Sequence, residues 1–500
     1  MITFQDYEKA PNKTEFIQQA LAKYTGSAEY RRAKMEAEYM AGRDTAIVET
    51  TKVIYNMLGQ PMNDFTAANN RISSNITHRL ISQRCSYLLG KGVSFSGTKQ
   101  KRGADGRTHT VDAVKDALGD KFDNIVFRAA YWACGNGESY TYVHKSHYAD
   151  KWEYDLFKKA EFLALYDGYT GKLRGGIRFW SLNWSDEAQP ITAILYTEEG
   201  YQKFQTREGE RGFGALYPVE QMRPYEETVQ YTQADGEQVI DGGNYTTIPI
   251  IPLYANESHT SALENLKPKI DALDLALSGF ANDMEDVATV YWVVNGGMGM
   301  DDKDLEKMRD KAKLLHFVHI DGDNGSITPH TTEPPYNARQ AFIEQIIERI
   351  YADFGALDVS KISAAQKTAT EIRAAYQAMD EEADAFEYQL IEYVQQILSI
   401  VGLEGMPQFP RNLIVNEKEQ AEIIIDAYTN NLIDRETALR KLSFITVDEV
   451  QDILNSMDAL ETADKKKLEE LRKAMEAEDD QTRENGTEDR PDNAGNGIQS

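Results

Sequence analysis

Cysteine, basic side chains and long apolar runs are all scarce in this chain of 500 residues. Its only cysteines, Cys85 and Cys134, are too few for a disulfide framework and favour a reducing compartment. No apolar run approaches the roughly 20 residues that a transmembrane helix requires, so we expect no membrane partner. The first residues, MITFQDYEKAPNKTEF, carry acids early and have no apolar core, so we expect no signal peptide.

Basic residues are also outnumbered by acidic ones. The chain has 54 Lys and Arg against 81 Asp and Glu, a formal net charge of −27. This balance disfavours a protein that wraps nucleic acid, because such binding needs lysine and arginine on the contact surface. It does not exclude a protein that lets DNA pass without holding it. At 41% hydrophobic residues the composition is globular, and a chain of this length is expected to form several substructures.

The sequence signatures of common enzymes are missing as well. There is no Gly-x-Ser-x-Gly elbow, and GGMGM at 296–300 lacks the Gly-Lys-Ser/Thr of a phosphate-binding loop. His144 and His147 are three residues apart in a strand-like stretch, as are His316 and His319, so the members of each pair point to opposite faces and do not suit a shared metal. We therefore expect no enzymatic activity and no cofactor.

Three acids lie just before a strand-like run that ends at GGMGM. Asp283, Glu285 and Asp286 are candidate metal ligands, but on a helix residue 285 points away from the face that 283 and 286 share. A solvated helix end is the favoured interpretation. DGDNG at 321–325 resembles a calcium loop, but its glycine comes one position early and no glutamate closes it, so we expect a hairpin turn there.

The first half of the chain changes texture along its length. Residues 1–90 and 111–135 have a helical pattern, and a polar, basic loop is expected at 98–109. From about 138 to 254, short alternating runs such as SYTYVH and ITAILYT predict antiparallel strands, with turns at DGYTG and DGGN.

Long helices follow after Pro252. The stretch 263–287 carries a single apolar stripe, although Pro268 suggests that the regular helix starts a turn later. A second helix is expected from 337 to 354, and a third of about thirty residues opens at TATE, 368–371. Between the first two helices lies a small β-α-β unit. Shorter helices are expected from 416 to about 476, and the polar tail beyond them is expected to stay disordered.

The order of these parts resembles the bacteriophage portal proteins of the SPP1-type siphophage family. The similarity rests on EYMAGRDTAI, on ANNRISSNITHRLISQRCSYLLGKGVSF, on IPIIPLYAN followed by a helix that ends FANDMEDVATVYWVVNG, and on KTATEI. It extends over nearly the whole chain. The family has no catalytic signature, so the order and spacing of these stretches carry the resemblance.

The resemblance implies an α+β, predominantly helical portal fold, assembled as a closed ring of about twelve copies around a channel. It divides the chain into the following parts: a wing at 1–258, strand-rich from about 138; a first stem helix at 259–288; a clip at 289–333; a second stem helix at 334–354; a tunnel loop at 355–367; a long connecting helix at 368–414; a crown at 415–475; and an acidic tail at 476–500.

The resemblance also implies a function, partners and sites. The ring would package and eject double-stranded DNA at one capsid vertex of the virion, after assembly in the host cytoplasm. Its partners would be the terminase large subunit, a head–tail adaptor protein, and capsid and scaffolding proteins. Candidate residues are as follows: in the tunnel loop, Asp358, Ser360, Lys361 and Lys367; at the channel mouth, Asp283, Glu285 and Asp286; in the clip, Trp292, Gly296, Gly297, Asp301, Asp302 and Lys303.

An acidic channel wall would repel the DNA backbone and avoid trapping it. Lys361 and Lys367 are ordinary loop lysines in one interpretation and a positive contact for passing DNA in the other. The three acids at the channel mouth would form a negative collar or bind a neighbouring subunit, because acids at a helix C-terminus oppose the helix dipole. Two alternatives remain: a helical adaptor or scaffold of the virion without DNA transit, and a metal-dependent nucleic-acid enzyme.

Overall fold

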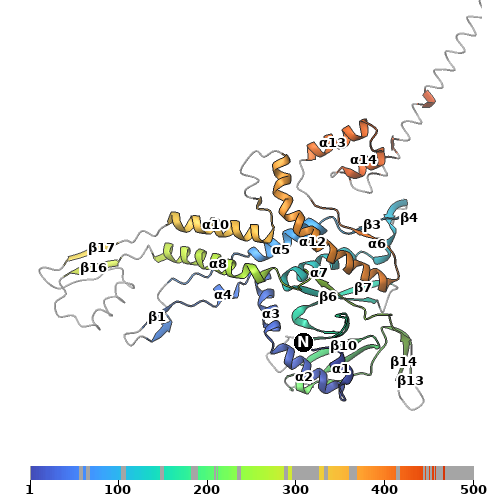
Figure 1. The fold of residues 1–500 in the computed structure, drawn as a ribbon, viewed down its shortest axis with the longest axis horizontal. Coiled ribbons are helices and arrows are strands. Elements are labelled where there is room, and N and C mark those ends of the chain that lie inside the picture. The colour runs from blue at the N-terminus through green and yellow to red at the C-terminus, as the bar shows by residue number, and fades with distance from the viewer. Residues whose placement is uncertain are drawn as a thin grey trace, which may run out of the picture. The chain divides into compact units, whose positions relative to one another are not determined.

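The computed structural model shows a mixed helical and stranded protein (Figure 1). It describes residues 2–55, 60–63, 68–102, 108–146, 151–181, 190–207, 210, 212–232, 238–286, 291–295, 326–330, 336–359, 369–412, 417–442, 445, 450, 453–454, 456–457 and 465–467. Two compact units are present, one of Met1–Thr98 with Asp112–Asn412 and one of Lys99–Val111 with Leu413–Ser500.

Helices lead the chain, as the sequence predicts. They are α1 (Phe4–Lys9), α2 (Lys13–Thr25), α3 (Ala28–Met40) and α4 (Thr45–Val48). Polar side chains cap the starts of α2 and α3. The side chain of Asn12 accepts hydrogen bonds from two backbone N–H groups in the first turn of α2, and the side chain of Ser27 accepts one from the first turn of α3. The buried face of α2, with Ile17 and Leu21, packs in one hydrophobic cluster with strands of the sheet described next.

The strand-rich region folds into antiparallel sheets, which confirms the prediction for 138–254. One sheet has the order β12-β11-β10-β9-β8 and another the order β15-β6-β7. The strands of these two sheets are β6 (Glu138–Lys145), β7 (Trp152–Lys158), β8 (Phe162–Tyr166), β9 (Leu173–Ser181), β10 (Ile191–Thr197), β11 (Gly200–Gln205), β12 (Tyr217–Pro218) and β15 (Ile250–Tyr254). The 3₁₀ turns η1 (Lys159–Glu161) and η2 (Phe213–Ala215) lie between them.

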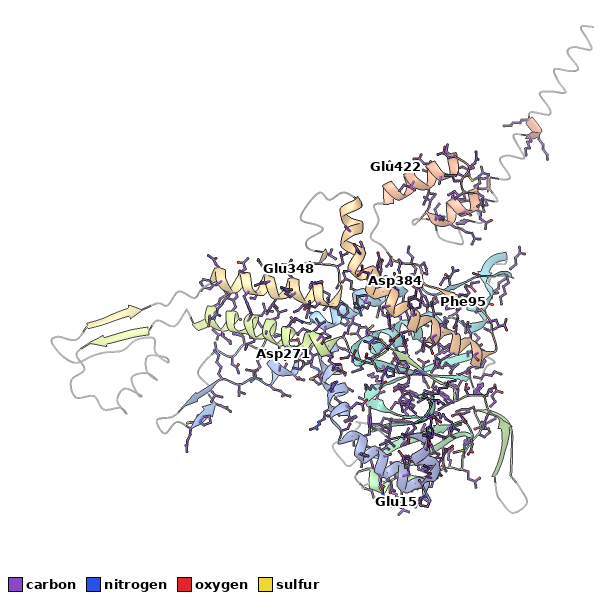
Figure 2. All side chains as sticks on the ribbon, in the orientation of Figure 1. Glu15, Phe95, Asp271, Glu348, Asp384 and Glu422 are labelled. Atoms are coloured by element: carbon purple, nitrogen blue, oxygen red, sulfur yellow. The ribbon has the colours of Figure 1, made fainter. Side chains whose placement is uncertain are left out.

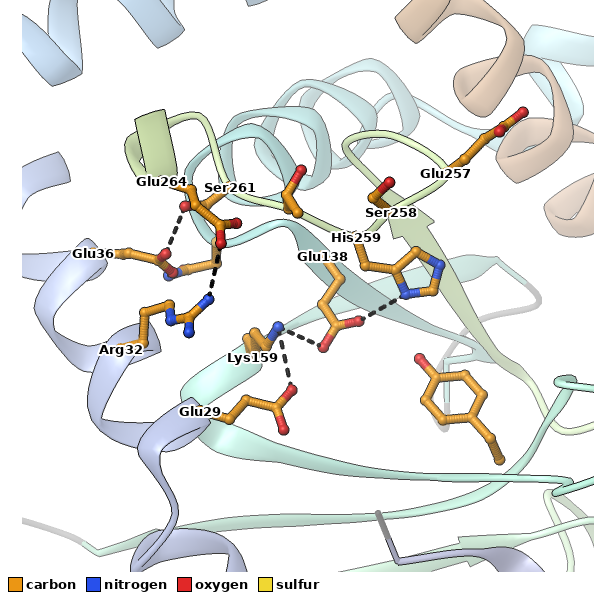
Figure 3. A pocket seen from close by; sticks show the side chains of 13 residues that line it. Glu29, Arg32, Glu36, Glu138, Lys159, Glu257, Ser258, His259, Ser261 and Glu264 are labelled. Atoms are coloured by element: carbon orange, nitrogen blue, oxygen red, sulfur yellow. Dashed lines mark hydrogen bonds and ion pairs between the residues drawn. The ribbon is translucent and has the colours of Figure 1, made fainter. Parts of the chain in front are cut away.

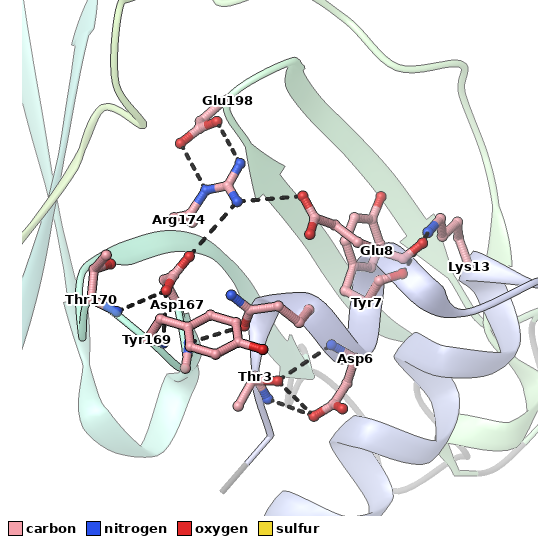
Figure 4. Close-up of polar contacts among 12 residues, drawn as sticks. Thr3, Asp6, Tyr7, Glu8, Lys13, Asp167, Tyr169, Thr170, Arg174 and Glu198 are labelled. Carbon is pink, nitrogen blue, oxygen red and sulfur yellow. Dashed lines mark hydrogen bonds and ion pairs between the residues drawn. The ribbon is translucent and has the colours of Figure 1, made fainter.

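Figure 4 shows how the N-terminus is tied to this region. Thr3 and Asp6 form a reciprocal capping box at the start of α1. Nearby, Arg174 of β9 makes two hydrogen bonds to Glu198, at 3.0 and 3.2 Å, and one to Glu8 of α1 at 3.4 Å. In the predicted DGYTG turn, Asp167 accepts two backbone N–H groups at 2.8 Å, so that turn is confirmed.

A second set of helices builds the largest hydrophobic core. It contains α5 (Ile76–Leu89), α6 (Ala113–Leu118), α7 (Phe122–Asn136) and α12 (Ala369–Val401). The stripe predicted for the longest helix is buried from Tyr376 to Ile397. Within that stripe the Tyr393 hydroxyl hydrogen-bonds to Thr141 of β6 at 2.7 Å, which joins α12 to the three-stranded sheet. The short strands β3 (Ser94–Phe95) and β18 (Pro407–Gln408) pair beside this core.

Small hairpins and the second unit complete the fold. The remaining elements are β1 (Val53–Tyr55), β2 (Pro61–Asn63), β4 (Thr98–Arg102), β5 (Thr108–Asp112), β13 (Glu226–Thr232), β14 (Gln238–Gly243), α13 (Glu417–Thr429) and α14 (Arg435–Lys441). Two predictions were wrong in detail. The basic stretch at 98–109 is largely a strand pair, β4 with β5, because its Lys, Arg and Thr side chains tolerate an exposed hairpin. The DGGN stretch is not a turn between strands, since its first three residues end β14.

Candidate functional site: the paired helices α8 and α10

Two long helices pack side by side at the position where the sequence predicts a helical pair. They are α8 (Leu263–Asp286) and α10 (Tyr336–Phe354), and Figures 1 and 2 show them running next to each other. The expectation that Pro268 delays the first helix was wrong, because Pro268 lies inside α8. A proline near a helix start removes one backbone hydrogen bond, and the buried apolar stripe around it supplies the compensating packing.

Ion pairs join the two helices at both ends. Lys269, near the start of α8, bonds Asp353 near the end of α10 at 2.9 Å. At the opposite end Asp283 of α8 pairs with Arg339 of α10. At the same end as Asp283 and Arg339, the rings of Phe280 and Tyr336 meet edge to face at 5.6 Å. The helices are therefore antiparallel.

The pair at the far end accounts for Asp283, one of the three acids that the sequence singles out. An acid near a helix C-terminus and a base near a helix N-terminus each oppose the local helix dipole. Because α8 and α10 are antiparallel, Asp283 and Arg339 come together and neutralise each other. Glu285 accepts a hydrogen bond from the side-chain amide of Asn70 at 2.9 Å. Asp286 ends α8, and its side chain lies outside the described residues.

This ion pair gives a charge-exchange prediction. Asp283→Arg places two like charges at one end of the helix pair and is expected to lower stability by about 0.5–1 kcal/mol, a small effect because both side chains are about one-third exposed. The double variant Asp283→Arg with Arg339→Asp is expected to recover most of that loss. Thermal unfolding of the two single variants and the double variant measures the coupling. Equal destabilisation of Asp283→Arg and the double variant would show that there is no coupling energy between Asp283 and Arg339.

A segment 200 residues away in the sequence runs along α8. We call residues 70–74 the strap. Three of its backbone N–H groups donate to polar side chains of α8: Ser74 to Asp274 at 3.0 Å, Ile72 to Ser278 at 2.9 Å, and Asn70 to Asn282 at 2.6 Å. Strap numbers fall as helix numbers rise, so the strap runs antiparallel to α8.

The spacing of these three hydrogen bonds follows from backbone geometry. Four residues of an α-helix advance by about 6 Å, and two residues of an extended chain advance by about 6.6 Å. Every second N–H of the strap therefore meets every fourth side chain of α8. This contact was not predicted from the sequence. Its only local trace is the polar series Asp274, Ser278 and Asn282, spaced by four along α8.

Between α8 and α10 the chain forms an antiparallel strand pair. β16 (Tyr291–Asn295) pairs with β17 (Ser326–His330), and Trp292 lies opposite Pro329. The strand predicted at TVYWVV is present from Tyr291 on, and the hairpin turn predicted at DGDNG lies outside the described residues. The helix predicted between the strands lies outside the described residues, as do these clip candidates: Gly296, Gly297, Asp301, Asp302 and Lys303.

The predicted tunnel loop is described only at its start. Asp358 is half-buried there, four residues beyond the end of α10. Ser360, Lys361 and Lys367 lie outside the described residues. The structure therefore leaves the prediction for the two lysines as it stands.

A polar cavity of about 500 Å³ lies where the chain passes from β15 to α8 (Figure 3). Buried Glu138 contacts Lys159 at 3.2 Å and His259 at 3.7 Å. Burial alone would raise the pKa of Glu138, but these two partners outweigh it and hold the pKa below its ordinary value. Glu36 accepts hydrogen bonds from Ser261 at 2.5 Å and from Asn136 at 3.1 Å, yet burial still raises its pKa. Because internal partners satisfy the buried carboxylates, the arrangement is that of a structural junction.

The described part of the chain offers no metal centre. Within it, no group of three or more His, Cys, Asp or Glu side chains is arranged to hold a metal ion. The same residues contain no helix long and apolar enough to cross a membrane. The helix pair, its strap and the strand pair are instead characterised by hydrogen bonds and ion pairs that connect distant segments of the chain.

Comparison with known proteins identifies the family of this chain. The model of the phage portal protein family described as SPP1 Gp6-like matches residues 21–481. The chain belongs to this family. Among relatives, the portal protein of Clostridium phage phiCD119 is 21% identical over 394 residues, covering 75% of this chain and 82% of the relative. The portal protein of Bacillus phage SPP1 is 23% identical over 424 residues, covering 81% and 79%.

Membership in the portal family confirms the resemblance inferred from the sequence. The matched region includes α8, α10, the strand pair between them and α12. Phage portal proteins are structural components of the virion capsid.

Proposed function

We propose that the chain forms a closed ring at one vertex of a phage capsid, through which double-stranded DNA is packaged and later ejected. The observation that carries this proposal is the portal-family match from 21 to 481, which includes both long helices and the strand pair between them. Copies of one chain form a ring when a single heterologous interface repeats until it closes.

The outer surfaces of the helix pair support such an interface. Leu275 and Met284 of α8 are 60% and 59% exposed, and Phe342 of α10 is 47% exposed. Covering such side chains with a partner removes apolar surface from water and stabilises the contact. A second copy of the chain is the partner that a ring requires. Water is excluded from these side chains when the neighbouring helix pair covers them.

The charge of the chain supports transit of DNA rather than tight binding. With a net charge of −27, most channel-facing surfaces would repel phosphate groups. DNA then meets few attractive sites that would hold it during packaging. Residues 355–367 form the tunnel loop in this proposal, and residues 289–333 form the clip that docks the terminase large subunit and then a head–tail adaptor. Capsid and scaffolding proteins contact the rest of the ring while it assembles in the host cytoplasm.

A packaging reaction tests the proposed function. Capsids assembled with the wild-type chain, terminase and ATP are expected to protect full-length DNA from nuclease, and capsids assembled without the chain are expected to protect none. Equal protection in both samples would reject the portal role. Capsids that form normally and contain the chain at more than one vertex would favour a general structural role in the virion instead.

Lys361 and Lys367 give a prediction in the same assay. If these lysines touch passing phosphate groups, the double variant Lys361→Ala with Lys367→Ala is expected to slow DNA entry or shorten the protected DNA. Loss of two charges weakens non-specific phosphate contact without affecting the fold, because both residues lie in a predicted loop. The control is Lys9→Ala, an exposed lysine at the end of α1 and outside both the proposed tunnel loop and the clip. Normal rate and length in the double variant would remove the lysines from the mechanism.

A further inference from the structure

Two carboxyl groups are buried together where the strap, α4 and α8 meet. Asp274 of α8 is 0% exposed, and Asp44, which precedes α4, is 1% exposed. Asp274 accepts the backbone N–H of Ser74 at 3.0 Å. Asp44 accepts the hydroxyl of Ser73 at 2.7 Å. One carboxylate oxygen of each side chain therefore accepts a hydrogen bond from the strap.

The other oxygen of each group has no donor. Asp274 Oδ2 and Asp44 Oδ1 are both buried, and no described residue donates to either oxygen in normal hydrogen-bond geometry. The Ser74 hydroxyl is also buried and unpartnered, and it acts to lower the pKa of Asp274, but burial and Asp44 outweigh it. The adjacent strap residues Ser73 and Ser74 each hold one of the two carboxyl groups, so the two groups are neighbours in the buried interior. Two bare carboxylates in such a position would repel each other at low dielectric, and a buried acceptor without a donor is costly.

The charged groups of the surrounding elements are engaged elsewhere. Their contacts are Arg43 with Glu38 at 2.7 Å, Arg71 with the Val48 carbonyl at 2.9 Å, Lys267 with Asp271 at 2.5 Å, Asp271 also with Tyr39 at 2.5 Å, and His78 with Tyr131 at 2.7 Å. None of these basic groups forms an ion pair with Asp44 or Asp274 among the described residues. A cationic side chain therefore does not neutralise the pair.

We propose that Asp44 and Asp274 share one proton, and that the resulting O–H···O hydrogen bond fastens α8 to α4 and the strap. A single proton supplies a donor for one orphaned oxygen and leaves the other as its acceptor. It also removes one of the two negative charges. This assignment concerns the internal anchoring of α8 and does not rest on the proposed channel function.

The direction of the Asp274 pKa agrees with this geometry. Burial, together with the neighbouring Asp44, raises the pKa of Asp274 from 3.8 to about 8. The closed state therefore holds a proton that an opened state releases at pH values between about 4 and 8. Anchoring from the shared proton is complete below pH 4, weakens as pH rises through this window, and is lost above pH 8.

Hydrogen exchange of the strap amides tests the proposal in the full chain. After correction for intrinsic exchange, protection of the Ile72 and Ser74 amides is expected to fall by up to about tenfold per pH unit between pH 5 and 8, and then to level off. In Asp274→Asn, the amide donates permanently to Asp44, so protection of these amides is expected to change little across that range. Asp44→Asn places the donor on the other side and is expected to give the same flat profile if Asp274→Asn folds poorly.

Control variants and added ions distinguish the alternatives. Ser278→Ala removes the neighbouring strap acceptor without a titrating group, so it is expected to lower protection at every pH and keep the wild-type slope. Equal slopes for the wild type and both Asn variants would overturn the shared proton. Protection that rises with added Mg²⁺, Ca²⁺ or Na⁺ at fixed pH in the wild type, but not in Asp274→Asn, would also overturn it and assign a cation to the pair.

Discussion

Replacing Gly137 with alanine is expected to lower the free energy of unfolding by about 2–5 kcal/mol. Gly137 follows α7 with a φ of +83°, a conformation that other residues rarely adopt. A Cβ atom there would lie 2.2 Å from the carbonyl oxygen of His259 and 3.0 Å from its carbonyl carbon. The loop that carries His259 leads directly into α8, so the substitution is also expected to displace the start of that helix.

Gly402 provides a matched control. It directly follows a helix, α12, with a similar φ of +76°, and an added Cβ would have no heavy atom within 4 Å. Gly402→Ala is therefore expected to cost only the left-handed backbone penalty, about 1–2 kcal/mol. Urea denaturation of both variants isolates the steric part. Equal losses of stability in the two variants would show that the close approach of His259 adds no steric penalty at position 137.

Removing two strap acceptors is the second large change. The double variant Ser278→Ala with Asn282→Ala is expected to lower the free energy of unfolding by about 2–6 kcal/mol, because it leaves the N–H groups of Ile72 and Asn70 without partners and each such loss costs about 1–3 kcal/mol. Both side chains are almost fully buried, so water replaces them poorly.

The comparison variant is Asn265→Ala, an exposed position on the same helix. Like the double variant, it places an alanine in α8, but it removes no contact to the strap. Its expected effect on the free energy of unfolding lies within about 0.5 kcal/mol. Chemical denaturation followed by circular dichroism measures all three proteins. A double variant as stable as Asn265→Ala would mean that the strap contributes nothing to the position of α8.

The long helices were predictable because their information is local. The apolar positions of α8 recur every three or four residues, and burial of Leu266, Ile270 and Leu273 follows from that spacing alone. The same holds for α12, which contains the apolar stripe of the helix predicted to open at 368–371. The strand-rich region was predicted for the same reason, since alternation along each strand reflects the local pleat.

The strap was not predictable because its partners are distant and half of each contact is backbone. Ser74 and Asp274 are separated by 200 residues, and a backbone N–H group leaves no mark on the sequence. Similarly, the sequence indicated that Asp283 needed a partner at its helix end. Only the antiparallel packing of α8 and α10 identified Arg339 as that partner. For Asp283, therefore, the sequence indicated that a partner was needed, and tertiary packing determined which residue it is.

Electron microscopy of the purified full chain tests the central claim most directly. If the chain forms the proposed portal, negatively stained particles are expected to show closed rings of uniform size with a stain-filled central hole. Rings should disappear or become irregular when the exposed apolar residues Leu275 and Phe342 of the helix pair are replaced by aspartate. Monomers, or open filaments without closed rings, in the wild-type preparation would contradict the account.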